Sequence, residues 1–261
     1  MSDYSKIKKI EGIKTSLKIL IIACATLFTF FLLKAVLFFI RNFERGYASV
    51  GIRYLIGAIV SVLILATIAF VLPYLLIKLY PKIYYYEDGF TLGKNGKKIF
   101  YKKLDYFYVP AYNKVNTFLA IKFKNNEDDW ENIAATGYSK SAFDLFQQDF
   151  LSANYQEAMN KIEAGETLEF LFNDPRKKIV AFGKRKYMEK KLEQALKIKV
   201  TKEGINFDGE KYDWDKYKIF VSLGNIIIQD INSNNILSIG DKALIHRLNL
   251  LEAIIDTLGK K

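Results

Sequence analysis

The sequence predicts a membrane-anchored α+β protein, in which a hairpin of two transmembrane helices precedes two mainly-β units that are each closed by a helix. Three observations predict this class. Two long apolar runs lie in the first third of the chain, short aromatic and β-branched runs follow them, and the second half of this β-rich part repeats the first. We therefore divide the chain into an N-terminal tail with two helices (1–81), a first β unit (82–165) and a second (166–261).

The two apolar runs, residues 19–40 and 54–77, are each long enough to cross a hydrocarbon core at about 1.5 Å per residue. The first contains one charge, Lys34, whose long stem is expected to carry the ammonium group to the interface. The second is uncharged, and Pro73 predicts a kink in its last third. A lipoprotein-type processing site before Cys24 is disfavoured, because the apolar run continues well beyond it. Small residues predict where the helices pack: Gly57 and Ser61 against Ala23 and Ala25.

The basic residues near the helix ends predict the orientation. Five lysines precede the first helix and five follow the second: Lys6, Lys8, Lys9, Lys14 and Lys18, then Lys78, Lys82, Lys94, Lys97 and Lys98. The loop between the helices holds only Arg41, Arg45 and Arg53. The sequence therefore predicts a multi-pass protein of the inner (cytoplasmic) membrane with both termini in the cytoplasm.

Short runs separated by turn residues predict the strands of the first β unit. They cover residues 83–86, 90–92, 98–101, 104–109, 118–123 and 130–134. Asn95-Gly96 predicts a tight hairpin turn with positive φ. Aromatic residues at helical spacing then predict a helix over residues 141–164 that ends at Gly165.

The second β unit repeats this pattern. Residues 82–92 align without gaps on residues 197–207, so that Asp88-Gly89 corresponds to Glu203-Gly204. After a two-residue deletion, Tyr101 corresponds to Trp214. Strands are expected near residues 219–223, 225–229 and 236–239. A closing helix with one apolar face is expected to follow, with Leu244, Leu248, Leu251, Ile255 and Leu258 on that face.

The acidic-Gly turns and the segment Tyr212-Asp213-Trp214-Asp215-Lys216-Tyr217 are similar to motifs of bacterial membrane proteins with pleckstrin-homology-like (PH-like) domains, including the YcxB-like group. The resemblance covers most of residues 82–261. It implies a small half-open barrel of about seven strands closed by a C-terminal helix, present twice. It implies no catalytic residues. Residues 176–196 depart from the pattern.

Residues that could carry chemistry are few. Cys24 is the only cysteine and His246 the only histidine, so a disulfide within the chain and a Cys/His metal site are excluded. We expect His246 to be structural and to lie in the closing helix, without a carboxylate beside it. Residues 89–95 resemble a phosphate-binding loop but are one residue short. The acidic residues 127–129 are expected to form a solvated turn. The sequence therefore predicts no enzyme activity, no metal and no cofactor.

The basic interval from Arg176 to Lys202 is the strongest candidate for a binding site. Its apolar residues Met188, Leu192 and Leu196 share one helical face, and most of its lysines lie away from that face. The net charge of +11 favours an anionic partner. We expect anionic lipid headgroups to contact five residues of this interval: Lys184, Arg185, Lys186, Lys190 and Lys191. A solvated helix face is the alternative interpretation.

These observations predict a non-enzymatic binding or scaffold protein, anchored in the bacterial inner membrane. The alternative is an immunity or inhibitor protein that captures a toxin at or near that membrane. A third hypothesis, hydrolysis through Asp213, Asp215 or His246, lacks a nucleophile and an orienting group beside them. The expected partners are the lipid bilayer, anionic headgroups and a protein or toxin. Nucleic acid is not expected, because no reader motif is present.

Overall fold

The computed structural model describes residues 6–44, 52–110, 118–125, 129–172, 196–222, 224–240 and 242–259. The chain divides into two compact units. The helical unit contains residues 11–82 together with Gly137–Ser139, and the β-rich unit contains residues 1–10, 83–136 and 140–261.

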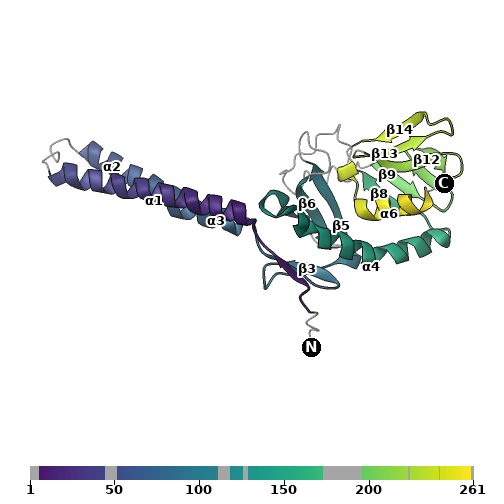
Figure 1. The fold of residues 1–261 in the computed structure, drawn as a ribbon, viewed down its shortest axis with the longest axis horizontal. Helices are drawn as coiled ribbons and strands as arrows, with labels where there is room; N and C mark the ends of the chain where they lie inside the picture. Colours follow the sequence, from purple (N-terminus) through teal and green to yellow (C-terminus); the bar gives the residue numbers. More distant parts are fainter. Residues whose placement is uncertain are drawn as a thin grey trace. The chain divides into compact units, whose positions relative to one another are not determined.

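The helical unit is built from two long apolar segments, coloured purple and blue in Figure 1. The first is α1 (Thr15–Glu44). The second consists of α2 (Ile52–Ala66), the π-helical turn η2 (Thr67–Val71) and α3 (Leu72–Lys78). Residues Thr15–Asn42 and Ile56–Lys78 form two helices that are long and apolar enough to cross a membrane. The two long apolar helices that the sequence predicts are therefore present.

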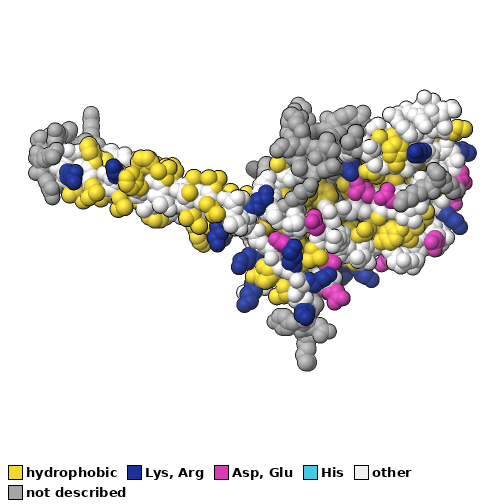
Figure 2. Space-filling view, viewed as in Figure 1, with side chains coloured by type: hydrophobic (Ala, Val, Ile, Leu, Met, Phe, Trp, Pro, Cys, Tyr) yellow, Lys and Arg dark blue, Asp and Glu magenta, His cyan; other side chains and the backbone are white. Residues whose placement is uncertain are grey.

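Most of the large apolar side chains of these helices face outward. Leu33, Leu63 and Tyr74 are each about 60% exposed, and hydrophobic side chains dominate the visible face of the helices in Figure 2. Only Ile21 and Ala69 are buried among the described residues of the two helices. A water-soluble helical pair would instead place its apolar residues inward.

Pro73 explains the π-helical turn. Proline has no backbone N–H and its ring clashes with the carbonyl four residues earlier, which here is that of Ala69, within η2. A π-helical turn therefore precedes the proline, in the region where the sequence predicts a kink. The expected contact at Gly57 is wrong, because a Cβ atom placed there would meet no atom within 4 Å.

The described residues of the β-rich unit form four sheets. The first half has a sheet of order β1-β2-β3-β4 and a sheet of order β5-β6-β7, and helix α4 (Asp144–Glu163) follows. The bounds of these strands are Lys9–Glu11, Ile83–Tyr85, Gly89–Leu92, Lys98–Phe100, Leu104–Pro110, Phe118–Asn125 and Glu131–Ala134. The observed fold is thus α+β, as the sequence predicts.

The second half has the same order of elements. A sheet of order β11-β10-β9-β8 precedes a sheet of order β12-β13-β14, and helix α6 (Leu248–Leu258) ends the described chain. The bounds of these strands are Leu168–Phe172, Leu196–Val200, Gly204–Phe207, Glu210–Asp213, Lys218–Ser222, Asn225–Gln229 and Asn235–Ile239. Among the described residues, each half therefore includes a four-stranded sheet, a three-stranded sheet and a helix.

The residues that the sequence aligns make the same backbone hydrogen bonds. The N–H of Tyr86 donates to Gly89 O at 2.8 Å, and the N–H of Thr201 donates to Gly204 O at 2.9 Å. Likewise Tyr101 N–H donates to Asp88 O at 3.0 Å, and Trp214 N–H donates to Glu203 O at 2.9 Å. The acidic-Gly turn has the same geometry in both halves.

One strand of each four-stranded sheet comes from outside the aligned segments. The three-residue strand β1 precedes the apolar helices and pairs with β2, so part of the N-terminal tail belongs to the β-rich unit. Lys8 strengthens this attachment, because its N–H donates to Tyr85 O at 2.9 Å and its ammonium group lies 2.7 Å from an Asp149 carboxylate oxygen. In the second half, β8 takes the corresponding place beside β9.

Two local expectations are wrong. The turn between β3 and β4 has its positive φ at Gly93 (83°), and neither Asn95 nor Gly96 has one. The closing helix begins only at Leu248, because Arg247 adopts a left-handed conformation with φ of 52° that ends the preceding turn. His246 therefore lies before the helix and not within it.

Candidate functional site

A buried polar arrangement in the β-rich unit lies on one face of the sheet β5-β6-β7, where Lys122 and His246 are buried. The opposite face carries Tyr106, Tyr108 and Phe123, which belong to the aromatic core beside α4. On the polar face, the register pairs Asp105 with Lys124, Phe107 with Lys122, and Val109 with Ala120. Phe107, Val109 and Ala120 form a buried cluster. We call this surface the β5 face.

Asp105 and His246 lie within ion-pair distance of each other on the β5 face. The Nδ1 atom of His246 lies 3.0 and 2.9 Å from the two carboxylate oxygens of Asp105. The His246 side chain is only 1% exposed, whereas that of Asp105 is 26% exposed. The two residues are 141 positions apart in the chain, so this pair joins the two halves of the β-rich unit.

Two aromatic rings enclose the imidazole. Phe107 stacks on His246 with ring centroids 5.0 Å apart, and Trp130 meets it edge-on at 5.5 Å. The ammonium group of Lys124 lies 5.3 Å from the centre of the Trp130 ring. The ring of His246 is thereby held in one orientation by packing as well as by its hydrogen bond to Asp105.

The backbone around His246 is fixed to both halves. Its N–H donates to Leu171 O at 2.8 Å, and the next N–H, from Arg247, donates to Tyr106 O at 2.8 Å. Phe172 and Ile245 form an isolated antiparallel bridge. The left-handed conformation of Arg247 makes the chain turn into α6 directly after these contacts.

Arg247 also fixes its own side chain. Its guanidinium group donates to Glu169 O at 2.5 Å and lies 5.1 Å from the centre of the Phe170 ring. Arg247 is therefore anchored to β8, and its charge lies close enough to Asp105 to stabilise the carboxylate.

Asn249 provides a second connection between the halves. The hydroxyl groups of Tyr106 and Tyr108 donate to its Oδ1 atom at 2.6 and 2.7 Å. The side-chain amide of Gln147 on α4 in turn donates to the Tyr108 hydroxyl at 3.0 Å. Burial raises the pKa of both tyrosines far above its ordinary value, so both stay protonated donors at physiological pH.

Opposing effects set the pKa of the Asp105 carboxyl group. Burial raises the pKa of Asp105, but the hydrogen bond and charge of His246, with further help from Arg247 and Lys124, outweigh it and hold the pKa below its usual value. Asp105 is therefore a carboxylate at neutral pH. A carboxylate that orients an imidazole is one element of an acid–base site, but this imidazole faces aromatic rings and is almost fully buried.

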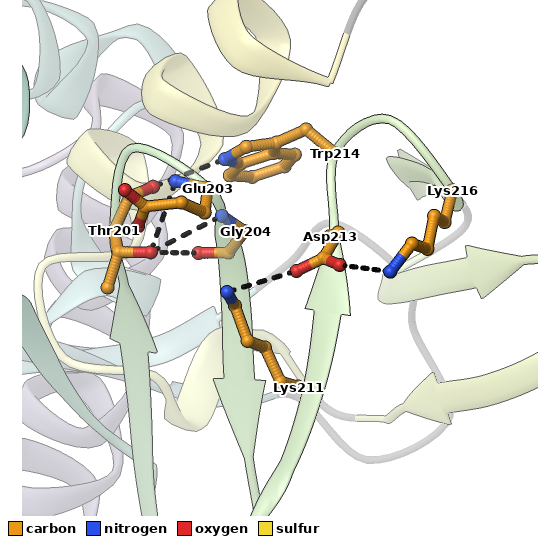
Figure 3. A network of polar contacts seen from close by, with 7 residues as sticks. All are labelled: Thr201, Glu203, Gly204, Lys211, Asp213, Trp214 and Lys216. Carbon is orange, nitrogen blue, oxygen red and sulfur yellow. Dashed lines mark hydrogen bonds and ion pairs between the residues drawn. The ribbon is translucent and has the colours of Figure 1, made fainter.

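The Trp214 motif forms a separate polar network, which Figure 3 shows. Trp214 is 7% exposed, and its indole N–H donates to Thr201 O at 3.2 Å. The Thr201 hydroxyl accepts from the N–H groups of Glu203 and Gly204. Trp214 lies just after β11, which ends at Asp213. Its burial and its hydrogen bond make it a core residue of the second half.

Asp213, one of the acidic residues of the hydrolysis hypothesis, pairs with lysines. Its two carboxylate oxygens lie 3.2 Å from Lys211 Nζ and 2.9 Å from Lys216 Nζ, as drawn in Figure 3. The hydrogen bonds from these lysines lower the pKa of Asp213. The carboxylate is thus committed to ion pairs and is poorly suited to take up a proton near neutral pH.

The lipid-contact residues expected from the sequence, Lys184 to Lys191, lie outside the described residues, and so do Glu127 and Asp128 of the acidic turn. Within the described chain, no group of three or more His, Cys, Asp or Glu side chains is placed to hold a metal ion. No sequence pattern indicates the Asp105–His246 pair, because Asp105 lies in an ordinary strand pattern far from His246. The expectation that no carboxylate lies beside His246 is wrong.

No family model, no curated protein and no solved structure matches this chain.

Proposed function

We propose that this protein is a non-enzymatic binding or scaffold protein of the bacterial inner membrane. In this proposal the two apolar helices span the membrane as a hairpin, both termini are cytoplasmic, and the β-rich unit consists of two PH-like halves that face the cytoplasm. The observation that carries the proposal is the outward exposure of large apolar side chains along both helices.

The surface of the helical unit supports membrane insertion. Its spans contain 28 and 23 residues, which at about 1.5 Å per residue match or exceed a hydrocarbon core of about 30 Å. Four hydroxyl groups within the spans are satisfied locally: those of Thr26, Thr29, Ser61 and Thr67 each donate to the carbonyl four residues earlier. Such internal hydrogen bonding suits a lipid environment, which offers no water to the backbone or hydroxyl groups.

The strand order supports two PH-like halves. The resemblance implies about seven strands and a closing helix in each unit, and the described residues of each half include a four-stranded sheet, a three-stranded sheet and a helix after them. The acidic-Gly turn, the motif that carries the resemblance, makes the same hydrogen bonds in both halves.

The environment of His246 supports a structural role for the residue that is most suited to acid–base catalysis. Its side chain is 1% exposed and lies against Phe107 and Trp130, and its carboxylate partner is Asp105. A substrate needs access to a catalytic imidazole. The pair connects the two halves, and a contribution to stability explains its presence without catalysis.

Extraction of membranes tests the anchoring. After expression in a bacterium, the full-length protein should stay with the membrane pellet in alkaline carbonate and be released only by detergent. A variant with Leu27 and Leu63 both changed to Lys should be lost from the pellet, because a charge near the middle of a span costs about 2.5–3.5 kcal/mol. Release of the unaltered protein by carbonate alone would contradict the proposal.

A further inference from the structure

Lys122 is an unusual residue on the β5 face. It lies in the middle strand of its sheet, with Phe107 of β5 on one side and Asn132 of β7 on the other. The residue is 9% exposed. Among the residues that the structure describes, none pairs with its ammonium group through a hydrogen bond or an ion pair. Lysine is almost never buried to this extent unless it is paired.

The lack of a counter-charge has an electrostatic consequence. Burial lowers the pKa of Lys122, and no carboxylate of the described chain acts in the opposite direction. The cost of partly withdrawing the ammonium group from water is therefore not offset by any protein group that the structure describes. A bound anion would offset it.

The surroundings of Lys122 favour an anion over a cation. Lys124 lies two residues further along β6, on the same face, with its ammonium group over the Trp130 ring. The one carboxylate in the neighbouring row, Asp105, is engaged by His246. Asn132, directly opposite Lys122, is exposed and has a side-chain amide that can donate.

The geometry points to an anion-binding site on the β5 face, in which the Lys122 ammonium group, assisted by Lys124 and the Asn132 amide, receives a phosphate group. Two sources carry this chemistry: the headgroup of an anionic phospholipid and a free phosphate compound. The site goes beyond the proposed function and does not depend on it, because binding of free phosphate requires no membrane.

The test uses the full-length protein in nanodiscs and follows its thermal unfolding midpoint. In discs of phosphatidylcholine, inorganic phosphate replaces chloride at constant ionic strength, which tests the free anion. In discs with added phosphatidylglycerol and no phosphate, the same measurement tests the headgroup. The variants are Lys122→Met, Lys122→Arg and, as a matched control, Lys103→Met, which changes an exposed lysine of the same half.

We expect the midpoint of the unaltered protein to rise in at least one of the two arms. Lys122→Met should weaken the apparent affinity in that arm by about tenfold or more, the usual effect of removing a charged hydrogen-bond donor. Lys122→Arg should keep most of the response, and Lys103→Met should behave as the unaltered protein. An equal response of Lys122→Met and the unaltered protein in both arms would show that the ammonium group merely reaches water, and would overturn the site.

A second measurement does not depend on the stability of Lys122→Met. After reductive methylation of the lysines with ¹³C, the Lys122 signal is identified as the one that is missing from Lys122→Arg. We expect this signal to shift with inorganic phosphate or with phosphatidylglycerol, and the Lys103 signal to stay in place. A Lys122 signal that does not move under either condition would contradict the proposal.

Discussion

Gly89 and Gly204 begin equivalent strands, β3 and β10, and neither position has space for a side chain. A Cβ atom at Gly89 would overlap the carbonyl oxygen of Ile99, and one at Gly204 would overlap the carbonyl oxygen of Tyr212. In both halves the neighbouring strand approaches at the same place, where Gly89 pairs with Phe100 and Gly204 with Asp213. Glycine is therefore required by packing in both copies of the acidic-Gly turn.

The first prediction follows from this close approach. Gly204→Ala should lower the free energy of unfolding by about 1–3 kcal/mol, because the backbone must move to admit the methyl group. Urea unfolding of the full-length protein in detergent, followed by far-UV circular dichroism, measures the change. Gly240→Ala is the matched control: its Cβ would meet only the Asn225 side chain, at 3.6 Å. If both variants were equally stable, the close approach would be absent in solution.

The second prediction concerns the Asp105–His246 pair. Because the pKa of Asp105 is lowered in the folded protein, the pair contributes stability that is complete above the unfolded pKa of about 4 and is lost as the pH falls through the lower, folded pKa. Asp105→Asn should cost about 1–3 kcal/mol at pH 7 and flatten the pH dependence below about pH 4.

Unfolding of the full-length protein at a series of pH values checks the second prediction. Asp256→Asn serves as its control, since Asp256 is an exposed residue of α6. The same acid dependence in Asp105→Asn as in the unaltered protein would show that Asp105 is not the titrating group.

Trp214 provides the third prediction. With 7% of its surface exposed and an indole N–H bonded to Thr201 O, its change to Ala should cost about 3–5 kcal/mol. Trp214→Phe keeps most of the ring and should cost less. Ile236→Ala removes a side chain that is 49% exposed and should change stability little. A stable Trp214→Ala protein would place the ring on the surface, as a binding residue.

The fourth prediction rests on the sequence alone. If Lys184, Arg185, Lys186, Lys190 and Lys191 contact anionic lipid, amide hydrogen exchange in this interval should slow when the full-length protein is moved from phosphatidylcholine nanodiscs to discs with phosphatidylglycerol. About 0.5 M salt should remove the difference, because it shortens the Debye length to a few ångströms. Equal exchange in the two kinds of disc would leave these residues as a solvated surface.

The sequence predicts the local elements of this fold well, and the contacts between distant segments poorly. Aromatic and β-branched runs, turn residues and the spacing of aromatic residues suffice for β5, β6 and α4, since each is a long element with a strong local preference. The strand Lys9–Glu11 could not be predicted, because a segment of only three residues carries no recognisable period. It becomes a strand only through its pairing with β2. The start of α6 lies later than predicted because the left-handed Arg247 is stabilised by contacts with β8 that no local pattern reveals.

The Asp105–His246 pair leaves no sign in the sequence for the same reason. Periodicity shows that Phe107 and Asp105 share a face of β5, but it does not show that this face meets a turn 141 residues later. A buried lysine is equally hard to predict, because Lys122 alternates with apolar residues in the manner of an exposed strand residue.

The topology of the proposed membrane protein, with two helices across the inner membrane and the β-rich unit in the cytoplasm, is open to one decisive measurement. Paired reporters are fused after Lys261, one active only in the cytoplasm and one active only in the periplasm. We expect activity of the cytoplasmic reporter alone, with the β-rich unit protected from protease added to spheroplasts. Activity of the periplasmic reporter, or cleavage of the β-rich unit from outside, would contradict the proposed topology.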